Sequence, residues 1–124
     1  MRISNEDLLT SGPVSLTTST TLRPIYLGHI AQYAIQLVFT GTPGGNFTLE
    51  CSNDPGHPNA QSKVEQSEDV DNWTTVADSA QAIAAAGNHV WNAENVGYLW
   101  VRVVWTQTSG TGSLISARVM AKGV

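Results

Sequence analysis

Charged side chains are scarce in this chain. Only 13% of its 124 residues are Asp, Glu, Lys or Arg, which is about half the share of a typical globular protein. Serine and threonine, with 11 and 13 copies, far outnumber the six basic residues. The surface is therefore expected to be neutral and rich in hydroxyl groups. Such a surface fits a protein that other subunits cover in an assembly, and it fits a secreted or particle-borne β domain equally well.

The chain also lacks the features that mark several other protein classes. The six basic residues do not cluster in the sequence and the net charge is −4, which argues against nucleic acid as a partner, since phosphate backbones are bound by converging cations. Cys51 is the single cysteine, so no intramolecular disulfide supports the fold. Residues 1–9 contain early acids and no apolar run, and no stretch approaches the roughly 18 apolar residues of a membrane span. We therefore expect synthesis in the cytoplasm without a signal peptide, and no membrane partner.

Groups that could carry out chemistry are few and scattered. His29, His57 and His89 lie in three separate segments and lack the short spacing of a metal-binding motif. Cys51 lies within an alternating, strand-like segment, where a free cysteine is usually a small buried hydrophobe. The acids of residues 65–71 lack the spacing and the turning glycine of a calcium loop. The sequence thus predicts a non-enzymatic protein with no catalytic residues, no cofactor and no metal site.

What the chain does contain is alternation of apolar and polar residues at the period of a β-strand. Two antiparallel hairpins are predicted from it: residues 32–40 with 47–52 around the glycine-rich segment 41–45, and residues 99–105 with 115–121 around the turn residues 108–112. In the second hairpin, Ile115, Ala117 and Val119 are expected to share one face. Trp105 shares a strand face with apolar residues and is expected in the core.

The remaining segments give weaker signals. Residues 14–22 are rich in threonine and are predicted to form an edge strand, whereas residues 4–9 are predicted to form one helical turn. The alanine-rich segment 79–86 is a candidate for a short helix that ends at a glycine. Residues 53–71 form the longest irregular segment, and an irregular segment of this length is usually functional or mobile.

About eight strands and no long helix predict an all-β fold. We expect a single antiparallel β-sandwich of the jelly-roll-like type, with residues 1–13 as a short N-terminal arm and residues 14–124 as the sandwich domain. A closed small barrel is the alternative topology. The arm is expected either to be free or to dock on a neighbouring subunit.

Seven residues are candidates for contacts with other subunits. They are Leu8 and Leu9 in the arm, Thr18 and Thr20 in the edge strand, and Trp100, Arg102 and Val104 on one strand face. That strand face is either a second buried layer or an interface, because aromatic and arginine side chains anchor both. Exposed tryptophan rings also stack sugars, so glycan binding is an open alternative.

Four motifs follow one another along the chain: Phe47-Thr-Leu-Glu-Cys-Ser-Asn-Asp, Asn72-Trp-Thr-Thr-Val, Tyr98-Leu-Trp-Val-Arg-Val-Val-Trp-Thr-Gln-Thr-Ser-Gly-Thr-Gly and Ala121-Lys-Gly. Over roughly residues 14–123 this series resembles small β-sandwich virion proteins of tailed bacteriophages. The resemblance implies a virion structural protein without catalytic residues, located in the virion, that contacts capsid or tail subunits and forms homo-oligomers. A capsid decoration or cement protein, which binds the outer shell and bridges subunits, is the favoured role. A tail, baseplate or head–tail accessory protein and a carbohydrate-binding adhesin module are the alternatives.

Overall fold

The computed structural model describes residues 3–9, 12–28, 30–94 and 96–123. Its elements, in chain order, are β1 (Ile3–Asp7), β2 (Val14–Ser15), β3 (Thr20–Thr21), β4 (Ile25–Tyr26), β5 (Ile30–Ser52), α1 (Lys63–Ser67), β6 (Thr74–Thr75), β7 (Gln81–Ile83), β8 (Gly87–Glu94) and β9 (Trp100–Gly123). Every strand pair is antiparallel. The prediction of an all-β antiparallel fold is confirmed. In the described ranges no helix has the length and apolar character needed to cross a membrane.

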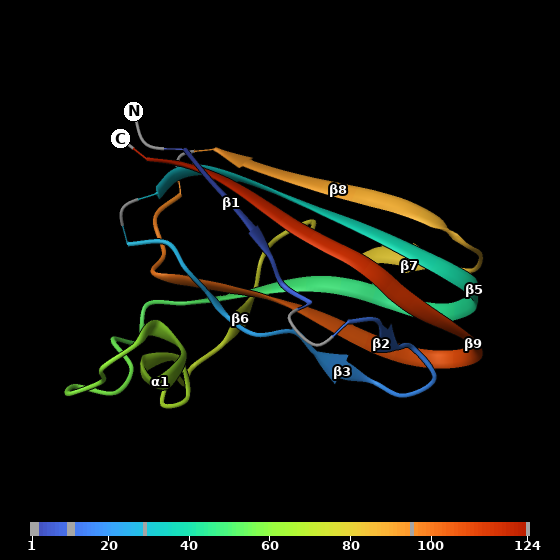
Figure 1. Cartoon of the computed structure of the whole chain (residues 1–124), viewed down its shortest axis with the longest axis horizontal. Coiled ribbons are helices and arrows are strands. Elements are labelled where there is room, and N and C mark those ends of the chain that lie inside the picture. Colours follow the sequence, from blue (N-terminus) through green and yellow to red (C-terminus); the bar gives the residue numbers. More distant parts are fainter. Residues whose placement is uncertain (1–2, 10–11, 29, 95, 124) are drawn as a thin grey trace.

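Two very long strands form the frame of the molecule. β5 and β9 pair over their whole lengths, from Ile30 opposite Gly123 to Ser52 opposite Trp100. The ribbon that they form folds over near its middle, so each strand contributes one half to each of two layers (Figure 1). We call the layer with the first half of β5 and the last half of β9 the upper sheet, and the other layer the lower sheet. A long ribbon folded in this way gives a jelly-roll-like sandwich.

Shorter strands complete both layers. In the upper sheet β1 pairs with β9 and β8 pairs with β5, which gives the order β1-β9-β5-β8. In the lower sheet β3 and β4 pair with β9, while β6 and β7 pair with β5. β2 joins β9 near the fold of the ribbon, with Val14 opposite Leu114.

The two predicted hairpins are wrong in their pairing. Residues 32–40 and 47–52 both belong to β5, and each pairs with a different half of β9. Residues 99–105 and 115–121 likewise fall in the two halves of β9. Alternation cannot separate these arrangements, because a hairpin and a folded ribbon both place every second side chain on the inner face.

The glycine-rich segments form the corner of the ribbon instead of two hairpin turns. Gly41 lies opposite Gly112, and Pro43 lies opposite Gly110. Gly41 has φ of +83°, and a Cβ on it would lie only 2.7 Å from the Cα of Gly112. Glycine is required there because it alone combines this backbone conformation with such a close approach of two chains. A register shift between Gly44 and Gly45 adds to the bend.

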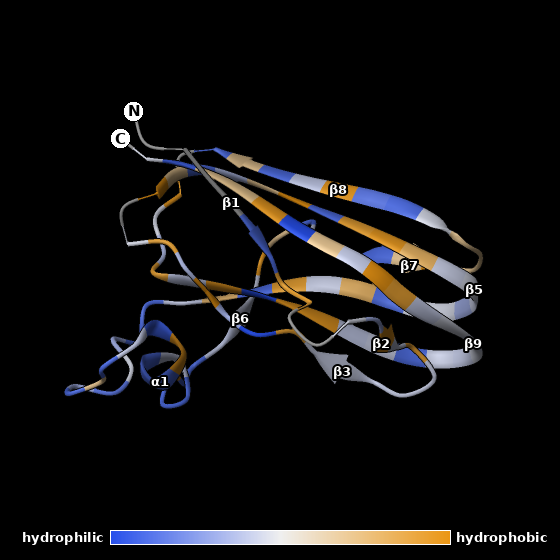
Figure 2. Ribbon diagram, viewed as in Figure 1, coloured by the Kyte–Doolittle hydropathy of each residue, from blue (hydrophilic) through white to orange (hydrophobic). Residues whose placement is uncertain are grey.

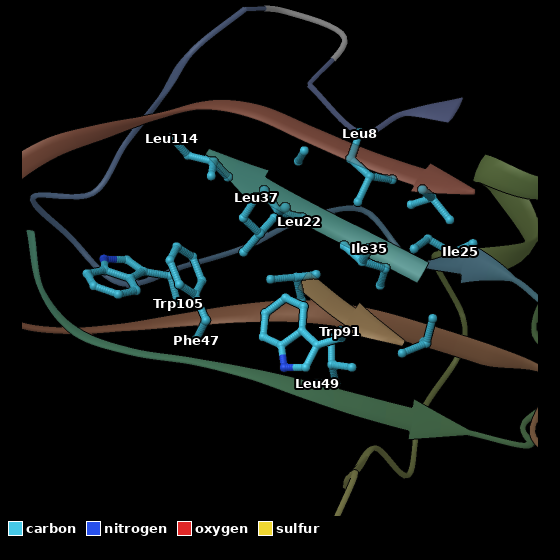
Figure 3. Packing of buried hydrophobic residues seen from close by; sticks show 14 of the residues in the cluster. Leu8, Leu22, Ile25, Ile35, Leu37, Phe47, Leu49, Trp91, Trp105 and Leu114 are labelled. Atoms are coloured by element: carbon cyan, nitrogen blue, oxygen red, sulfur yellow. The ribbon is translucent and has the colours of Figure 1, made fainter. Parts of the chain in front are cut away.

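The core fills the space between the two layers. Figure 3 shows the rings of Trp105, Phe47 and Trp91 lying between them, with Phe47 4.6 Å from Trp105 and 6.4 Å from Trp91 between ring centroids. Phe39 from the upper half of β5 approaches Phe47 from the lower half at 5.7 Å. Trp105 is 1% exposed and its Nε1–H donates to the carbonyl oxygen of Leu16 at 3.0 Å. The prediction that Trp105 is a core residue is confirmed.

A β-bulge changes the predicted face of Ile115. Val38 lies opposite Ser116, but the next residue, Phe39, lies opposite Leu114, so Ile115 is the extra residue of a bulge. Leu114 takes the inward position at 1% exposure and Ile115 is 46% exposed. The expectation that Ile115 shares the inward face of Ala117 and Val119 is therefore wrong.

Two segments predicted to be helical are strands. Residues 3–7 form β1 along the edge of β9, and the N–H of Leu8 continues this pairing by donating to the carbonyl oxygen of Ala117 at 2.8 Å. Residues 81–83 form β7 because they pair with Gly45–Phe47 of β5. In both cases tertiary pairing outweighs a weak local preference for helix. Residues 1, 2, 10 and 11 of the predicted arm lie outside the described residues.

Candidate functional site

One end of the outer face of the lower sheet is covered by the chain itself. Trp100 points away from the core, yet it is 0% exposed, because residues 53–73 fold back over that end of the sheet. Its Nε1–H donates to the carbonyl oxygen of Asp54 at 3.0 Å, and its ring packs edge-on against Tyr26 at 5.1 Å between centroids. The Lys63 ammonium lies 3.8 Å from the centroid of the Tyr26 ring. The sequence left a second buried layer and an interface open for this face, and at Trp100 the structure shows a buried layer.

Hydrogen bonds hold this covering segment in place. The Asp54 carboxylate accepts from the N–H groups of Gly56 at 2.9 Å and of Asp71 at 3.1 Å. Ser52 Oγ donates to the carbonyl oxygen of Asp71 at 2.6 Å, which ties the end of β5 to the far side of the segment. α1 begins with Ser62 as N-cap, whose Oγ accepts from the N–H of Glu65 at 3.1 Å. Residues 53–71, predicted to be irregular, thus form a hydrogen-bonded cover with one helical turn (Figure 1).

Arg102 belongs to the same cover. Its guanidinium lies 4.1 Å from the centroid of the Trp73 ring and forms an ion pair with Glu50, with Arg102 Nη2 2.6 Å from Glu50 Oε1. Arg102 Nε also donates to Glu50 Oε1 at 2.8 Å. Both charged side chains are about one-quarter exposed. The ring and the carboxylate therefore already engage the guanidinium within the folded chain.

The seven predicted contact residues separate into three groups. Leu8, Leu9 and Trp100 are buried within this chain, so they are not part of its surface. Thr20, Arg102 and Val104 are half-buried, and Thr18 is exposed. The threonine-rich edge is much shorter than predicted, because β2 and β3 contain two residues each. Contact of Thr18, Thr20, Arg102 or Val104 with another subunit stays a prediction.

Three of the four tryptophans offer no ring face for stacking on a sugar. Trp91, Trp100 and Trp105 are at most 8% exposed. Trp73 is half-buried and carries the Arg102 guanidinium on its ring. The glycan-binding alternative depended on exposed rings, so it now rests on Trp73 alone and stays a prediction.

The outer face of the upper sheet has no such cover in the described part of the chain. Side chains of β8, β5 and β9 point to it in four cross-strand rows: Glu94–Gln32–Lys122, Asn92–Ala34–Met120, Val90–Gln36–Arg118 and Asn88–Val38–Ser116. We call these four rows the open face. Along the upper strands, Figure 2 shows hydrophobic and hydrophilic bands alternating, as expected when one face meets the core and the other faces outward.

The open face combines exposed apolar side chains with few charges. Val90 is 49% and Met120 is 44% exposed, and shallow hollows beside them are lined by Ala34. Its rows contain Glu94, Arg118 and Lys122, and Arg118 lies opposite Asp7 of the neighbouring β1, so the local charges balance. Sequence reasoning missed Val90 and Met120. Alternation marks them as outward-facing, but only the pairing of three distant segments places them together.

The buried titratable groups lie at one end of the sandwich. Cys51 and Tyr98 line the same shallow hollow, and Tyr98 Oη lies 2.6 Å from Tyr33 Oη. Burial raises the pKa of the Cys51 thiol and of both tyrosine hydroxyls. The thiol is therefore held in its protonated, weakly nucleophilic form. Across the described ranges, no group of three or more His, Cys, Asp or Glu side chains is close enough to hold a metal ion.

The two histidines that the structure describes lie in different segments, and neither is in β5 with Cys51. His57 lies in the covering segment, where its Nδ1 accepts from the N–H of Asn59 at 3.2 Å. His89 lies in β8 against Trp91, at 4.8 Å between ring centroids, and burial lowers its pKa. His29 is outside the described residues.

Comparison with known proteins identifies the fold. No protein-family model and no curated protein matches the chain. The SPBc2 prophage-derived protein YomS is similar in structure with a TM-score of 0.54 and 10% identity, over 97% of this chain and 92% of that chain. A chain from the structure of infectious bursal disease virus Gx strain is similar with a TM-score of 0.50 and 12% identity, over 98% of this chain and 32% of that chain. At these identities the likeness shows a shared β-sandwich fold, which is found in a prophage-derived protein and in a virus.

Proposed function

We propose that this chain is a non-enzymatic structural protein of a bacteriophage virion, and that it serves as a decoration protein on the outer shell of the capsid. The observation that carries the proposal is the open face, a largely neutral sheet surface without a cover in the described residues, whereas residues 53–73 cover one end of the other outer face. The fold shared with a prophage-derived protein and with a viral chain supports the phage setting. The scattered titratable groups of the described residues support a role without catalysis.

The composition of the open face fits a surface that lies on another protein. Its two middle rows contain Val90, Ala34 and Met120 together with Arg118, and Glu94 and Lys122 lie in an end row. Stable protein interfaces likewise combine exposed apolar side chains with a small number of polar and charged ones. Because Asp7 and Glu94 balance Arg118 and Lys122, the matching shell surface is expected to be largely neutral.

The proposal is tested first on particles. Virions from the phage or prophage that encodes the chain are purified, and their proteins are identified by mass spectrometry. We expect the chain in intact heads. A mutant phage without the gene should still form heads, which release DNA at a lower temperature than wild-type heads. Absence of the chain from particles would refute a virion role, and its presence in isolated tails but not in heads would refute decoration.

A pair of matched variants tests the open face. Met120→Glu places a charge at its centre, whereas Val64→Glu makes the same kind of change on α1, where Val64 is 60% exposed. Each purified variant is added to heads that lack the protein, and the bound fraction is measured by co-sedimentation. We expect Met120→Glu to lose binding and Val64→Glu to keep it. Equal binding by the two variants would exclude the open face as the contact surface.

A further inference from the structure

The edges of the two sheets differ in how well they are protected against pairing with another chain. Exposed strand edges recruit further strands unless they are very short or carry charges or proline. In the lower sheet, β3, β4, β6 and β7 have two or three residues each. In the upper sheet, β1 carries Glu6 and Asp7, and Arg23 donates to both residues. These edges all have one of the usual protections.

β8 is the exception among the described edges. It is eight residues long, pairs with β5 on one side only, and runs along the upper border of the molecule in Figure 1. It contains no proline and no lysine, and its single charged residue, Glu94, lies at its end. Val90, at its middle, is 49% exposed. A long and nearly neutral edge of this kind is suited to pairing with a further strand.

The sequence of β8 indicates which strand that is. Residues 88–92 read Asn-His-Val-Trp-Asn and are close to a palindrome about Val90. A two-fold axis makes the same strand meet itself in the opposite direction, so each residue type must suit its mirror position. With Val90 opposite Val90 of a second copy, Asn88 lies opposite Asn92 and His89 lies opposite Trp91. This register also keeps every outward residue of one copy beside an outward residue of the other.

Charge favours a second copy at this edge as well. In the antiparallel register centred on Val90, the two Glu94 side chains lie at opposite ends of the paired strands, and each is beside the uncharged start of the other β8. The β1 edge would behave differently, because Glu6 and Asp7 of two copies would be brought close together. Like charges on facing strands are destabilising.

We infer that this protein self-associates through β8, with two copies joined about a two-fold axis in an antiparallel strand pair that places Val90 opposite Val90. The two upper sheets then form one continuous sheet, and the two open faces become one surface. A single strand pair buries less area than a standard stable interface, so a weak dimer is expected, one that dissociates on dilution. This inference concerns the free protein and does not depend on the proposed virion role.

Charge exchange at Val90 tests the inference. The mass of the free protein is measured by analytical ultracentrifugation from about 10 μM to about 1 mM, a range in which weak association is detected. Val90→Lys and Val90→Glu should each weaken the dimer by about fivefold to tenfold, because the substituted side chain faces its own copy. An equimolar mixture of the two variants should restore association, since Lys then faces Glu. Val64→Lys and Val64→Glu, at an exposed site on α1, should leave the dimer unchanged.

A second set of variants tests the register. The double change Asn88→Lys with Asn92→Glu should tighten the dimer, because each Lys faces a Glu of the other copy. Asn88→Lys with Asn92→Lys should loosen it. All of these positions are outward-facing, and far-ultraviolet circular dichroism verifies that each variant is folded. A monomeric wild-type protein at the highest concentration, or a dimer that none of these charge changes affects, would overturn the inference.

Discussion

The two outer faces of this sandwich differ in whether the chain itself covers them. The lower sheet carries residues 53–73 on its outer face, which enclose Trp100 and engage Arg102. The upper sheet carries no such layer in the described residues, and Val90 and Met120 remain about half exposed. A sandwich needs only its two inner faces to be buried. The bare upper face is therefore the better candidate for contact with another molecule, and the covered face contributes to stability.

The largest difference in stability between the two faces is expected when one side chain on each face is truncated to alanine. Trp100→Ala removes a fully buried ring together with its hydrogen bond to Asp54, and it should reduce the free energy of unfolding by about 3–5 kcal/mol. Met120→Ala on the open face should change it by less than about 0.5 kcal/mol. Urea unfolding followed by tryptophan fluorescence and circular dichroism measures both values. Similar losses for the two variants would show that the upper face is not bare in solution.

A smaller decrease in the free energy of unfolding is expected when residues 53–73 lose a hydrogen-bonding group but the Trp100 ring is kept. Asp54→Ala deletes the carboxylate that accepts from Gly56 and Asp71, and it should cost on the order of 1–2 kcal/mol. The loss should be local, because neither hydrogen bond belongs to the β5–β9 ladder. Hydrogen exchange should therefore speed up in residues 53–73 and stay unchanged in β5 and β9. Faster exchange throughout the ladder would mean that the cover and the sandwich unfold as one unit.

The smallest change in the free energy of unfolding is expected from removing one ion pair on each face. Glu50→Gln leaves the half-buried Arg102 without its carboxylate and should cost about 1 kcal/mol. Asp7→Asn weakens the pair with Arg118, whose Nη2 lies 3.8 Å from Asp7 Oδ2, and both of its side chains are largely exposed. That change should cost no more than about 0.5 kcal/mol and should vanish at high salt. Thermal unfolding at low and high ionic strength distinguishes the stability losses of the two variants. If both losses depended equally on salt, the difference in burial between the two ion pairs would be contradicted.

Much of the candidate surface was beyond the reach of sequence reasoning. Trp100, Arg102 and Val104 do share one strand face, as alternation predicted. Whether that face is bare or covered depends on where residues 53–73 fold. The alternation of side chains along a strand does not predict that position. Val90 and Met120 were missed because each is an ordinary apolar residue in its own strand. They become a surface only when β8, β5 and β9 lie side by side.

By itself the amino-acid sequence determined the fold class, the strand-forming segments of β5 and β9 and the core position of Trp105. These follow from side-chain alternation, from β-branched and aromatic residues, and from glycine, all of which act within a few residues of the chain. Only the tertiary structure decided that the glycine-rich segments are corners, that Ile115 faces outward and that Leu8 and Leu9 complete their own core. Each of these depends on the register between β9 and a strand distant from it in sequence, and local patterns are the same for either pairing.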